Sequence, residues 1–203
     1  LSGRKDLFEG LAIEKLETEW TQYPILHLDL NSQKYDTPEA LTDILNNAVS
    51  QWEQTYGIVE TEKSLGMRFG GVMQRAYEKT GRQVVVLIDE YDKPLLQAYG
   101  NDDLLNDYRG TLKAFYGNLK SCDKYIKFAL LTGVTKFGKV SVFSDLNNLE
   151  DISMLKNYTG ICGITNDELH QYFDLQIEEL AQDNGMTKED AYDKLREDYD
   201  GYH

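Results

Sequence analysis

The clearest hydrophobic pattern in the chain is a run of five apolar residues, four of them β-branched, that leads into two acids: VVVLIDE, residues 84–90. An apolar run of this length is typical of a strand that is buried on both faces of a sheet. The pattern therefore predicts a buried strand over Val84–Asp89, and the following Asp92-Lys93-Pro94 predicts the turn that ends it, because proline cannot continue a strand.

Two more apolar segments predict strands, at Ile25–Leu30 and at Tyr125–Thr132. Between the strands, apolar residues recur at helical spacing. They predict one helix from Pro38 to Gly57, a second over Thr61–Thr80 and a third that begins after the capping residue Asn101. The order strand, two helices, strand, helix, strand is typical of an α/β fold with a parallel sheet and crossover helices.

The two ends of the chain have a different character. Leu7–Trp20 predicts helical turns packed on a core, and the residues after Gly133 are more polar. Near the C-terminus, Thr165 and Glu168 form a capping-box pattern that begins a helix through Tyr172, and Thr187 begins another. We therefore expect a core over residues 1–150 and the start of a helical lid or linker region over residues 151–203.

Composition and charge narrow the functional classes. The 203 residues include 35 acids against 21 lysines and arginines, a formal net charge of -14. A surface this acidic repels phosphate backbones, so we expect no broad nucleic-acid surface, although a loop with a metal ion can still bind one nucleotide. Two cysteines imply no disulfide framework, no apolar run is long enough to span a bilayer, and a cytoplasmic location is the simplest expectation.

The two acids that follow the apolar run predict chemistry at the carboxyl edge of the sheet. Asp89 and Glu90 end a strand, where the turning chain lets both side chains reach the crevice at that edge. One carboxylate, Asp89, would hold Mg²⁺, and the other, Glu90, would orient the water that attacks a γ-phosphate. This is the arrangement of a Walker B element, and the alternative is that both acids simply begin a solvated loop.

Thr132 is the third candidate site residue, because it ends the next predicted strand. In a parallel sheet it emerges at the same edge as Asp89, where its hydroxyl can bond the attacking water or the γ-phosphate, the role called sensor 1. The alternative is an ordinary strand-terminal threonine, since threonine favours strands.

Several stretches of the chain resemble the AAA-ATPase-like family of bacteria and archaea: VVVLIDEYDKPL, LKAFYGNLK, TGVTKFGKVSVFSDLNNLEDIS, GITNDEL and LREDYDGYH. The resemblance implies a P-loop NTPase core of the AAA+ type, the binding of ATP and Mg²⁺, and a Walker A loop near the N-terminus. Many members also carry a nuclease-like domain of the PD-(D/E)xK type after this core.

This chain departs from the family pattern, because it contains neither the Walker A segment nor the nuclease-like segment. No segment matches the Walker A pattern G-x-x-x-x-G-K-[ST]: the cluster Gly66–Gly71 lacks the Lys-Ser/Thr pair, and Phe137-Gly138-Lys139-Val140 lacks the hydroxyl and the spacing. We therefore expect the core to be missing its first strand and its phosphate-binding loop, and both ends of the chain to be truncations of a longer protein.

Basic residues supply weaker candidates. Arg68, Arg75 and Arg109 are possible arginine fingers, although helix salt bridges are the simpler interpretation. Lys136 and Lys139 follow Thr132 and could approach a phosphate or a partner subunit, although solvated loop lysines are the simpler interpretation.

The leading expectation is an AAA+-like ATPase domain, incomplete in itself, with Asp89 on the metal, Glu90 on the water and Thr132 on the γ-phosphate. Its partners would be a nucleotide and other copies of itself. The first alternative is a nucleotide-independent module that keeps the AAA+ shape. The second is a metal nuclease that uses Asp89 and Glu90, which the net charge of -14 disfavours.

Overall fold

A computed structural model describes residues 2–134, 142–143, 146, 148–153, 155–158, 160–161 and 163–199 of the chain. The chain divides into two compact units, Leu1–Leu149 and Glu150–His203. In the described part, no helix combines the length and the apolar character needed to cross a bilayer.

The first unit contains a parallel sheet of three strands: β1 (Ile25–Asp29), β2 (Val84–Asp89) and β3 (Ile126–Leu131). The strand order is β1-β2-β3, so the acidic strand β2 lies in the centre with a parallel neighbour on each side. The α/β fold with a parallel sheet that the alternation of elements predicts is confirmed. A central strand with both neighbours in place explains why β2 is the most apolar of the three.

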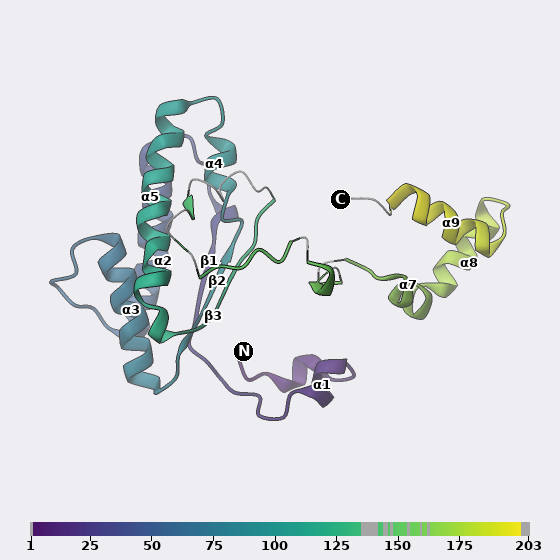
Figure 1. Cartoon of the computed structure of the whole chain (residues 1–203), viewed down its shortest axis with the longest axis horizontal. Coiled ribbons are helices and arrows are strands. Elements are labelled where there is room, and N and C mark those ends of the chain that lie inside the picture. The colour runs from purple at the N-terminus through teal and green to yellow at the C-terminus, as the bar shows by residue number, and fades with distance from the viewer. Residues whose placement is uncertain are drawn as a thin grey trace. The chain divides into compact units, whose positions relative to one another are not determined.

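Three long helices lie along one side of this sheet: α2 (Pro38–Tyr56), α3 (Leu65–Thr80) and α5 (Asp102–Ser121) (Figure 1). Two of their termini follow ordinary capping chemistry, whereas the Thr37 side chain at the start of α2 makes no capping hydrogen bond. Gly81 has a left-handed φ of 67° at the end of α3, and the Asn101 side chain accepts a hydrogen bond from Leu104 N at the start of α5.

The predicted start of the second helix at Thr61 is wrong. Helix α3 begins at Leu65 because the Ser64 hydroxyl accepts a hydrogen bond from Met67 N and so caps the first turn. Glu62 lies outside the helix, where its carboxylate pairs with Arg75 at 2.6 Å.

The core lies between the three helices and the sheet. At its centre the rings of Phe69 on α3 and Phe115 on α5 stack with centroids 4.3 Å apart, and Trp52 on α2 packs on Phe69. The sheet contributes the alternate residues that face the helices. These include Leu26, Leu28, Val84, Val86, Ile88, Ile126, Ala129 and Leu131.

Glycines allow α3 to approach α5 closely. A Cβ atom on Gly66 would lie 2.9 Å from Asn118 Nδ2, and one on Gly70 would lie 3.2 Å from Cys122 Sγ. A Cβ atom on Gly71 would lie 2.0 Å from the Glu62 carboxylate. The glycine cluster that fails the Walker A pattern therefore serves helix packing.

A group of polar side chains, here named the α2–α3 ionic cluster, joins these two helices. The Arg68 guanidinium donates to both carboxylate oxygens of Glu53, at 3.0 and 2.7 Å, and also to Asn46 and Ser50. Glu53 is only 5% exposed. The Arg68 hydrogen bond lowers the pKa of Glu53 below its ordinary value, so the buried carboxylate stays charged.

The opposite face of the sheet is less covered. Phe128, which pairs with Val85 in the register, is 47% exposed, and His27 is exposed as well. Leu87 and Leu130 on the same face are half-buried. The two faces of one sheet thus differ sharply in how much apolar surface they bury.

A short helix, α4 (Lys93–Gln97), follows β2 where a turn is predicted. Pro94 lies in its first turn, a position where proline is tolerated because that N–H has no partner inside a helix. The turn prediction is therefore corrected, and Leu95 of this helix is buried in the core.

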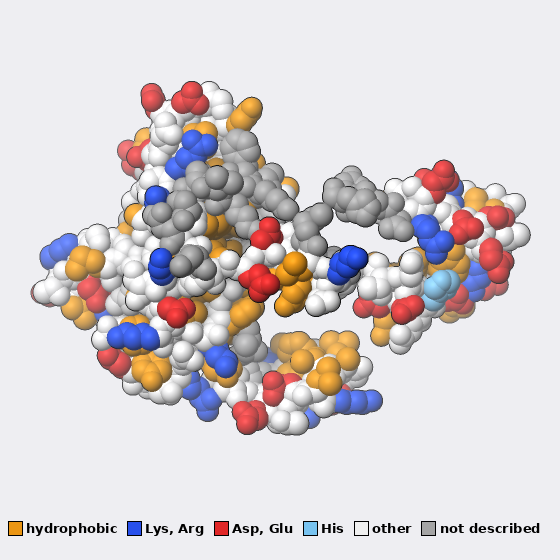
Figure 2. Space-filling model, in the orientation of Figure 1, with side chains coloured by type: hydrophobic (Ala, Val, Ile, Leu, Met, Phe, Trp, Pro, Cys, Tyr) orange, Lys and Arg blue, Asp and Glu red, His pale blue; other side chains and the backbone are white. Residues whose placement is uncertain are grey.

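The N-terminal segment forms the predicted helical turns but does not bury them. It contains a 3₁₀ turn at Lys5–Phe8 and helix α1 (Ala12–Leu16), and Phe8 packs on Trp20. Figure 2 shows apolar side chains gathered on the surface over α1. Its exposed members include Leu7, Leu11, Ile13 and Leu16.

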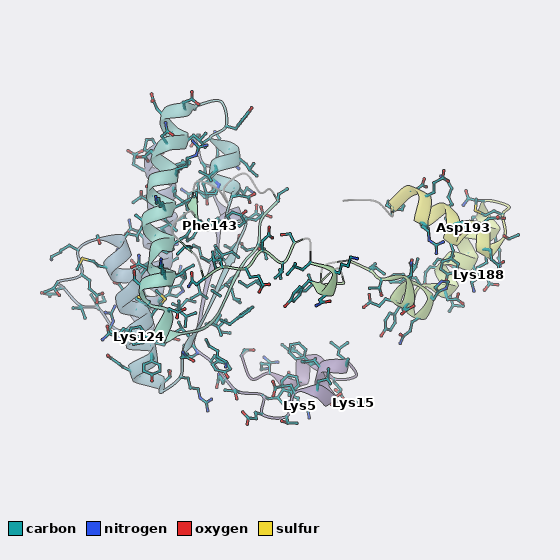
Figure 3. The ribbon with its side chains drawn as sticks, viewed as in Figure 1. Lys5, Lys15, Lys124, Phe143, Lys188 and Asp193 are labelled. Carbon is teal, nitrogen blue, oxygen red and sulfur yellow. The ribbon has the colours of Figure 1, made fainter. Side chains whose placement is uncertain are left out.

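The second unit contains helices α7 (Asn166–Tyr172), α8 (Asp174–Asp183) and α9 (Lys188–Tyr199). The predicted capping box is present, because Thr165 and Glu168 exchange side-chain and backbone hydrogen bonds. Lys188, labelled in Figure 3, donates to Asp174 at 2.6 Å. The buried core of this unit is small and consists of Ile177, Ala181 and Ala191.

Shorter 3₁₀ turns lie at Leu30–Ser32, Asp123–Tyr125 and Lys156–Tyr158. The first two flank strands and redirect the chain at their ends.

Candidate functional site

The carboxyl ends of the three strands bring the predicted site residues to one edge of the sheet. Asp89 ends β2 and Thr132 directly follows β3. The Thr132 hydroxyl donates a hydrogen bond to Asp89 Oδ1. Two side chains 43 positions apart in the sequence are therefore in direct contact, and both are exposed to solvent. We call this side of the sheet, where the carboxyl ends of the strands lie, the carboxyl edge. Its predicted site residues are Asp89, Glu90 and Thr132.

Glu90 has an unusual backbone conformation. Its φ is 55°, in the left-handed region that residues with a Cβ atom seldom adopt. Its N–H donates to Asp89 Oδ1 at 3.1 Å, so the chain turns sharply after the strand. Strained backbone of this kind persists where the surrounding structure enforces it, and it concentrates at functional sites.

The turn at Glu90 allows two adjacent acids to lie near one site. Adjacent residues of a strand point to opposite faces, so two adjacent acids in a strand could not serve one site. Asp89 is still within β2, and the left-handed residue after it redirects the chain. The Asp89 side chain is exposed and that of Glu90 is half-buried.

A third acid lies at the same edge. Asp29 ends β1 and is the register partner of Asp89, so the two residues lie side by side on neighbouring parallel strands. Asp29 also accepts a hydrogen bond from Asn31 N at 2.7 Å, and Asn31 Oδ1 in turn accepts one from Lys93 Nζ. Sequence reasoning missed Asp29, although the signal was the same as for Asp89: an acid at the end of an apolar strand.

A shallow pocket opens beside these residues on the less covered face of the sheet. Its walls combine apolar strand side chains with the polar groups of the edge. It is lined by His27, Leu87, Ile88, Asp89, Leu130 and Thr132.

The oxygen atoms at this edge are of the ligand type that a hard cation such as Mg²⁺ prefers. Asp89 offers a carboxylate and Thr132 a hydroxyl, both of which are oxygen ligands. Across the described residues, however, no group of three or more His, Cys, Asp or Glu side chains could hold a metal ion. A magnesium ion at Asp89 would therefore need waters or phosphate oxygens to complete its coordination, as is usual for this metal.

The fold and the geometry of this edge can now be compared with known proteins. A family model described as "Predicted AAA-ATPase" matches residues 1–143. The chain belongs to the AAA-ATPase-like family. The match covers all three strands of the sheet and the whole carboxyl edge of this AAA-ATPase-like chain.

One curated relative is 32% identical to the AAA-ATPase-like chain over 202 residues. It is a protein of Azotobacter chroococcum mcd 1 named "Uncharacterized protein in vnfD 5'region". The alignment covers 99% of this chain but 37% of the relative, so this chain spans little more than a third of that protein's length. No solved structure matches the chain.

The candidate arginines of the AAA-ATPase-like chain differ in their surroundings. Arg68 and Arg75 are held by the carboxylates of Glu53 and Glu62 at 2.7 and 2.6 Å. Arg109 on α5 donates to the side chain of its neighbour Asn106 at 3.3 Å. The guanidinium groups of Arg68 and Arg75 are thus already paired within the fold. Lys136 and Lys139 lie outside the described residues.

Proposed function

We propose that this chain supplies the hydrolytic half of an ATP site, in which Asp89, Glu90 and Thr132 act together at the carboxyl edge of the parallel sheet. The observation that carries the proposal is the hydrogen bond from the Thr132 hydroxyl to Asp89, next to a left-handed Glu90. Membership of the AAA-ATPase-like family supports it, because ligands of open α/β sheets bind outside the carboxyl ends of the strands.

The three side chains would divide the chemistry of the Walker B and sensor 1 positions. Asp89 would hold Mg²⁺ through its carboxylate, directly or through the metal's water shell. When bound, that ion would neutralise charge on the phosphate oxygens.

Glu90 would accept a proton from the attacking water or orient that water, a task that requires a carboxylate close to, but separate from, the metal ligand. The Thr132 hydroxyl, which donates to Asp89, would turn to the γ-phosphate oxygen or the water when nucleotide is present. A hydroxyl both donates and accepts, so one residue can serve either partner.

The phosphate-binding loop would come from outside these 203 residues, since none of them matches G-x-x-x-x-G-K-[ST]. Such a loop cradles the phosphates with backbone N–H groups and a lysine. In this proposal the intact protein brings that loop to the carboxyl edge, helices α7–α9 begin a lid over the nucleotide, and further copies of the chain complete the assembly.

The decisive experiment measures phosphate release from Mg·ATP by the intact protein and by its Glu90→Gln variant. Loss of the general base should lower kcat by at least about 100-fold, while ATP still binds, because Gln keeps the size of the side chain. Binding is checked by the rise in melting temperature that Mg·ATP produces. Glu60→Gln, at an exposed loop position, is the matched control and should hydrolyse ATP normally. Equal hydrolysis by Glu90→Gln and wild type would refute the role of Glu90.

The second candidate is a binding module that keeps the AAA+ shape without using a nucleotide. It would account for the lack of a Walker A match in these 203 residues if the longer protein also has no such loop. It predicts that Mg·ATP leaves the melting temperature of the intact protein unchanged, whereas the ATPase predicts a rise.

A further inference from the structure

An acid two residues after Glu90 is buried completely. The Asp92 side chain is 0% exposed, and together with Glu53 it is one of two buried charged residues in the described part of the chain. Burial of a carboxylate is unfavourable unless hydrogen bonds or opposite charges compensate for it. One compensating group is the backbone N–H of Val134, which donates to Asp92 Oδ1 at 3.2 Å.

Two backbone hydrogen bonds join the same two segments. Tyr91 N donates to Thr132 O and Thr132 N donates to Ile88 O, both at 2.9 Å. The paired register of β2 and β3 ends at Ile88 and Leu131. Hydrogen bonding therefore continues past the end of the ladder and past the left-handed Glu90. We name residues 88–92 and 132–134 the edge clasp.

Gly133 lies where the clasp is tightest. A Cβ atom there would lie 2.5 Å from Asp92 Oδ1 and 2.6 Å from a ring carbon of Tyr91. Contacts that short do not occur, and Tyr91 has little room to move because the residue is only 9% exposed. Only glycine lets the segment after Thr132 lie against Asp92.

Aromatic side chains of the core pack against the edge clasp. Phe143, labelled in Figure 3, packs against Tyr91 and against Tyr116 of α5, with ring centroids 5.1 and 5.4 Å apart. Tyr116 is fully buried; this burial, with a smaller contribution from nearby charges that include Asp92, raises the pKa of its phenol. The Asp92 turn is thus backed by uncharged, tightly packed aromatic groups.

We propose that Asp92 is a positioning residue that fixes the segment after Thr132 to the turn that carries Glu90, so that the Thr132 hydroxyl and the Glu90 carboxylate keep one relative position. This inference rests on the proposed function, because the relative position of the two groups matters to hydrolysis only if they act on one nucleotide. Asp92 itself does not contact the nucleotide. A displacement of Thr132 would move Glu90 with it.

The first test needs no nucleotide and uses the 203-residue chain. Native-state amide hydrogen exchange, read by NMR, reports the opening of each N–H. In Asp92→Ala the exchange of the Val134 amide should accelerate by at least about tenfold relative to amides of β1 and α2. Asp92→Asn keeps an oxygen that can accept from Val134 N and should restore much of the protection. Glu53→Gln, at the other buried acid, should loosen α2 and α3 and leave Val134 unaffected.

The second test uses the intact protein and Mg·ATP. Asp92→Ala should lower kcat by about 10- to 100-fold with little change in KM, since misplaced catalytic groups slow the chemical step while the phosphates are held elsewhere. Asp92→Asn should recover most of kcat, a rescue that a general loss of stability would not give.

The outcomes separate this proposal from the proposed function. Unchanged exchange at Val134 in Asp92→Ala overturns it. So does a normal kcat for Asp92→Ala in a protein whose hydrolysis is abolished by Glu90→Gln. If the intact protein hydrolyses no ATP, the proposed function is refuted, and so is the catalytic part of the positioning role. The exchange rate of the Val134 amide then decides by itself whether Asp92 fixes the edge clasp.

Discussion

Two groups of charged side chains in the same unit are built in opposite ways. In the α2–α3 ionic cluster, Arg68 meets both oxygens of Glu53, and the carboxylate is 5% exposed. At the carboxyl edge, Asp89 and Thr132 are exposed, and Glu90, directly after Asp89, has a strained backbone conformation. The first group satisfies every charge within the fold and so stabilises it. The second leaves oxygen atoms accessible and gains little stability, which is the arrangement that binding an outside partner requires.

The comparison predicts its largest effect at Arg68. Arg68→Ala would leave the buried Glu53 carboxylate without its partner, and breaking a buried pair in this way should lower the free energy of unfolding by about 3 kcal/mol. Urea denaturation followed by circular dichroism measures it. Asp89→Asn, at an exposed acid, should change the same quantity by less than about 0.5 kcal/mol. If the two variants lose similar amounts of unfolding free energy, the contrast between the ionic cluster and the carboxyl edge is wrong.

A smaller effect of opposite sign is expected at Glu90. Glycine adopts a left-handed φ without steric cost, so Glu90→Gly should raise the free energy of unfolding by about 1 kcal/mol while it removes the proposed base. Glu90→Ala is the matched control, because alanine keeps the Cβ atom that causes the strain and should give no such gain. Thermal unfolding measures the stability of both variants relative to wild type. A loss of stability in Glu90→Gly would show that the carboxylate itself stabilises the turn.

The smallest effect is a pH dependence of the ionic cluster. Arg68 lowers the folded-state pKa of Glu53, so the pair's contribution to stability is complete above the ordinary carboxylate pKa and is lost as the pH falls through the lowered value. The difference in stability between wild type and Arg68→Ala should therefore be larger at pH 7 than at pH 3. Urea midpoints at pH 7, 5 and 3 test this, and a constant difference would contradict it.

Much of the fold could be predicted because local chemistry determines it. The run Val84–Asp89 has one reasonable interpretation, and the cap Asn101 and the left-handed Gly81 begin and end helices as capping chemistry predicts. Boundaries failed where two local signals competed. Helix α3 begins after the cap Ser64 and not at Thr61, and Pro94 lies in the first turn of α4 where a turn was predicted.

The site was predictable only in part. The contact of Thr132 with Asp89 follows from parallel strands that end at the same edge. The burial of Asp92 could not be predicted from the strand pattern. It involves a hydrogen bond from Val134, 42 positions away, and the close approach of Gly133. The left-handed φ of Glu90 also has no local signal, since glutamate seldom adopts it. Likewise, the apolar residues of α1 predicted burial but lie on the surface, because an apolar pattern does not say what covers it.

The glycines of α3 have a consequence for the order in which the chain folds. Gly66, Gly70 and Gly71 lie within a helix of 16 residues. Each glycine disfavours an isolated helix by about 1 kcal/mol relative to alanine, so this segment gains little from forming alone. Helix α2, made earlier, supplies one set of contacts, but Gly66 and Gly70 pack closely against α5, which is synthesised later and lies beyond β2 in the sequence. We therefore expect α3 to reach its full stability during synthesis only after α5 emerges and packs against these glycines.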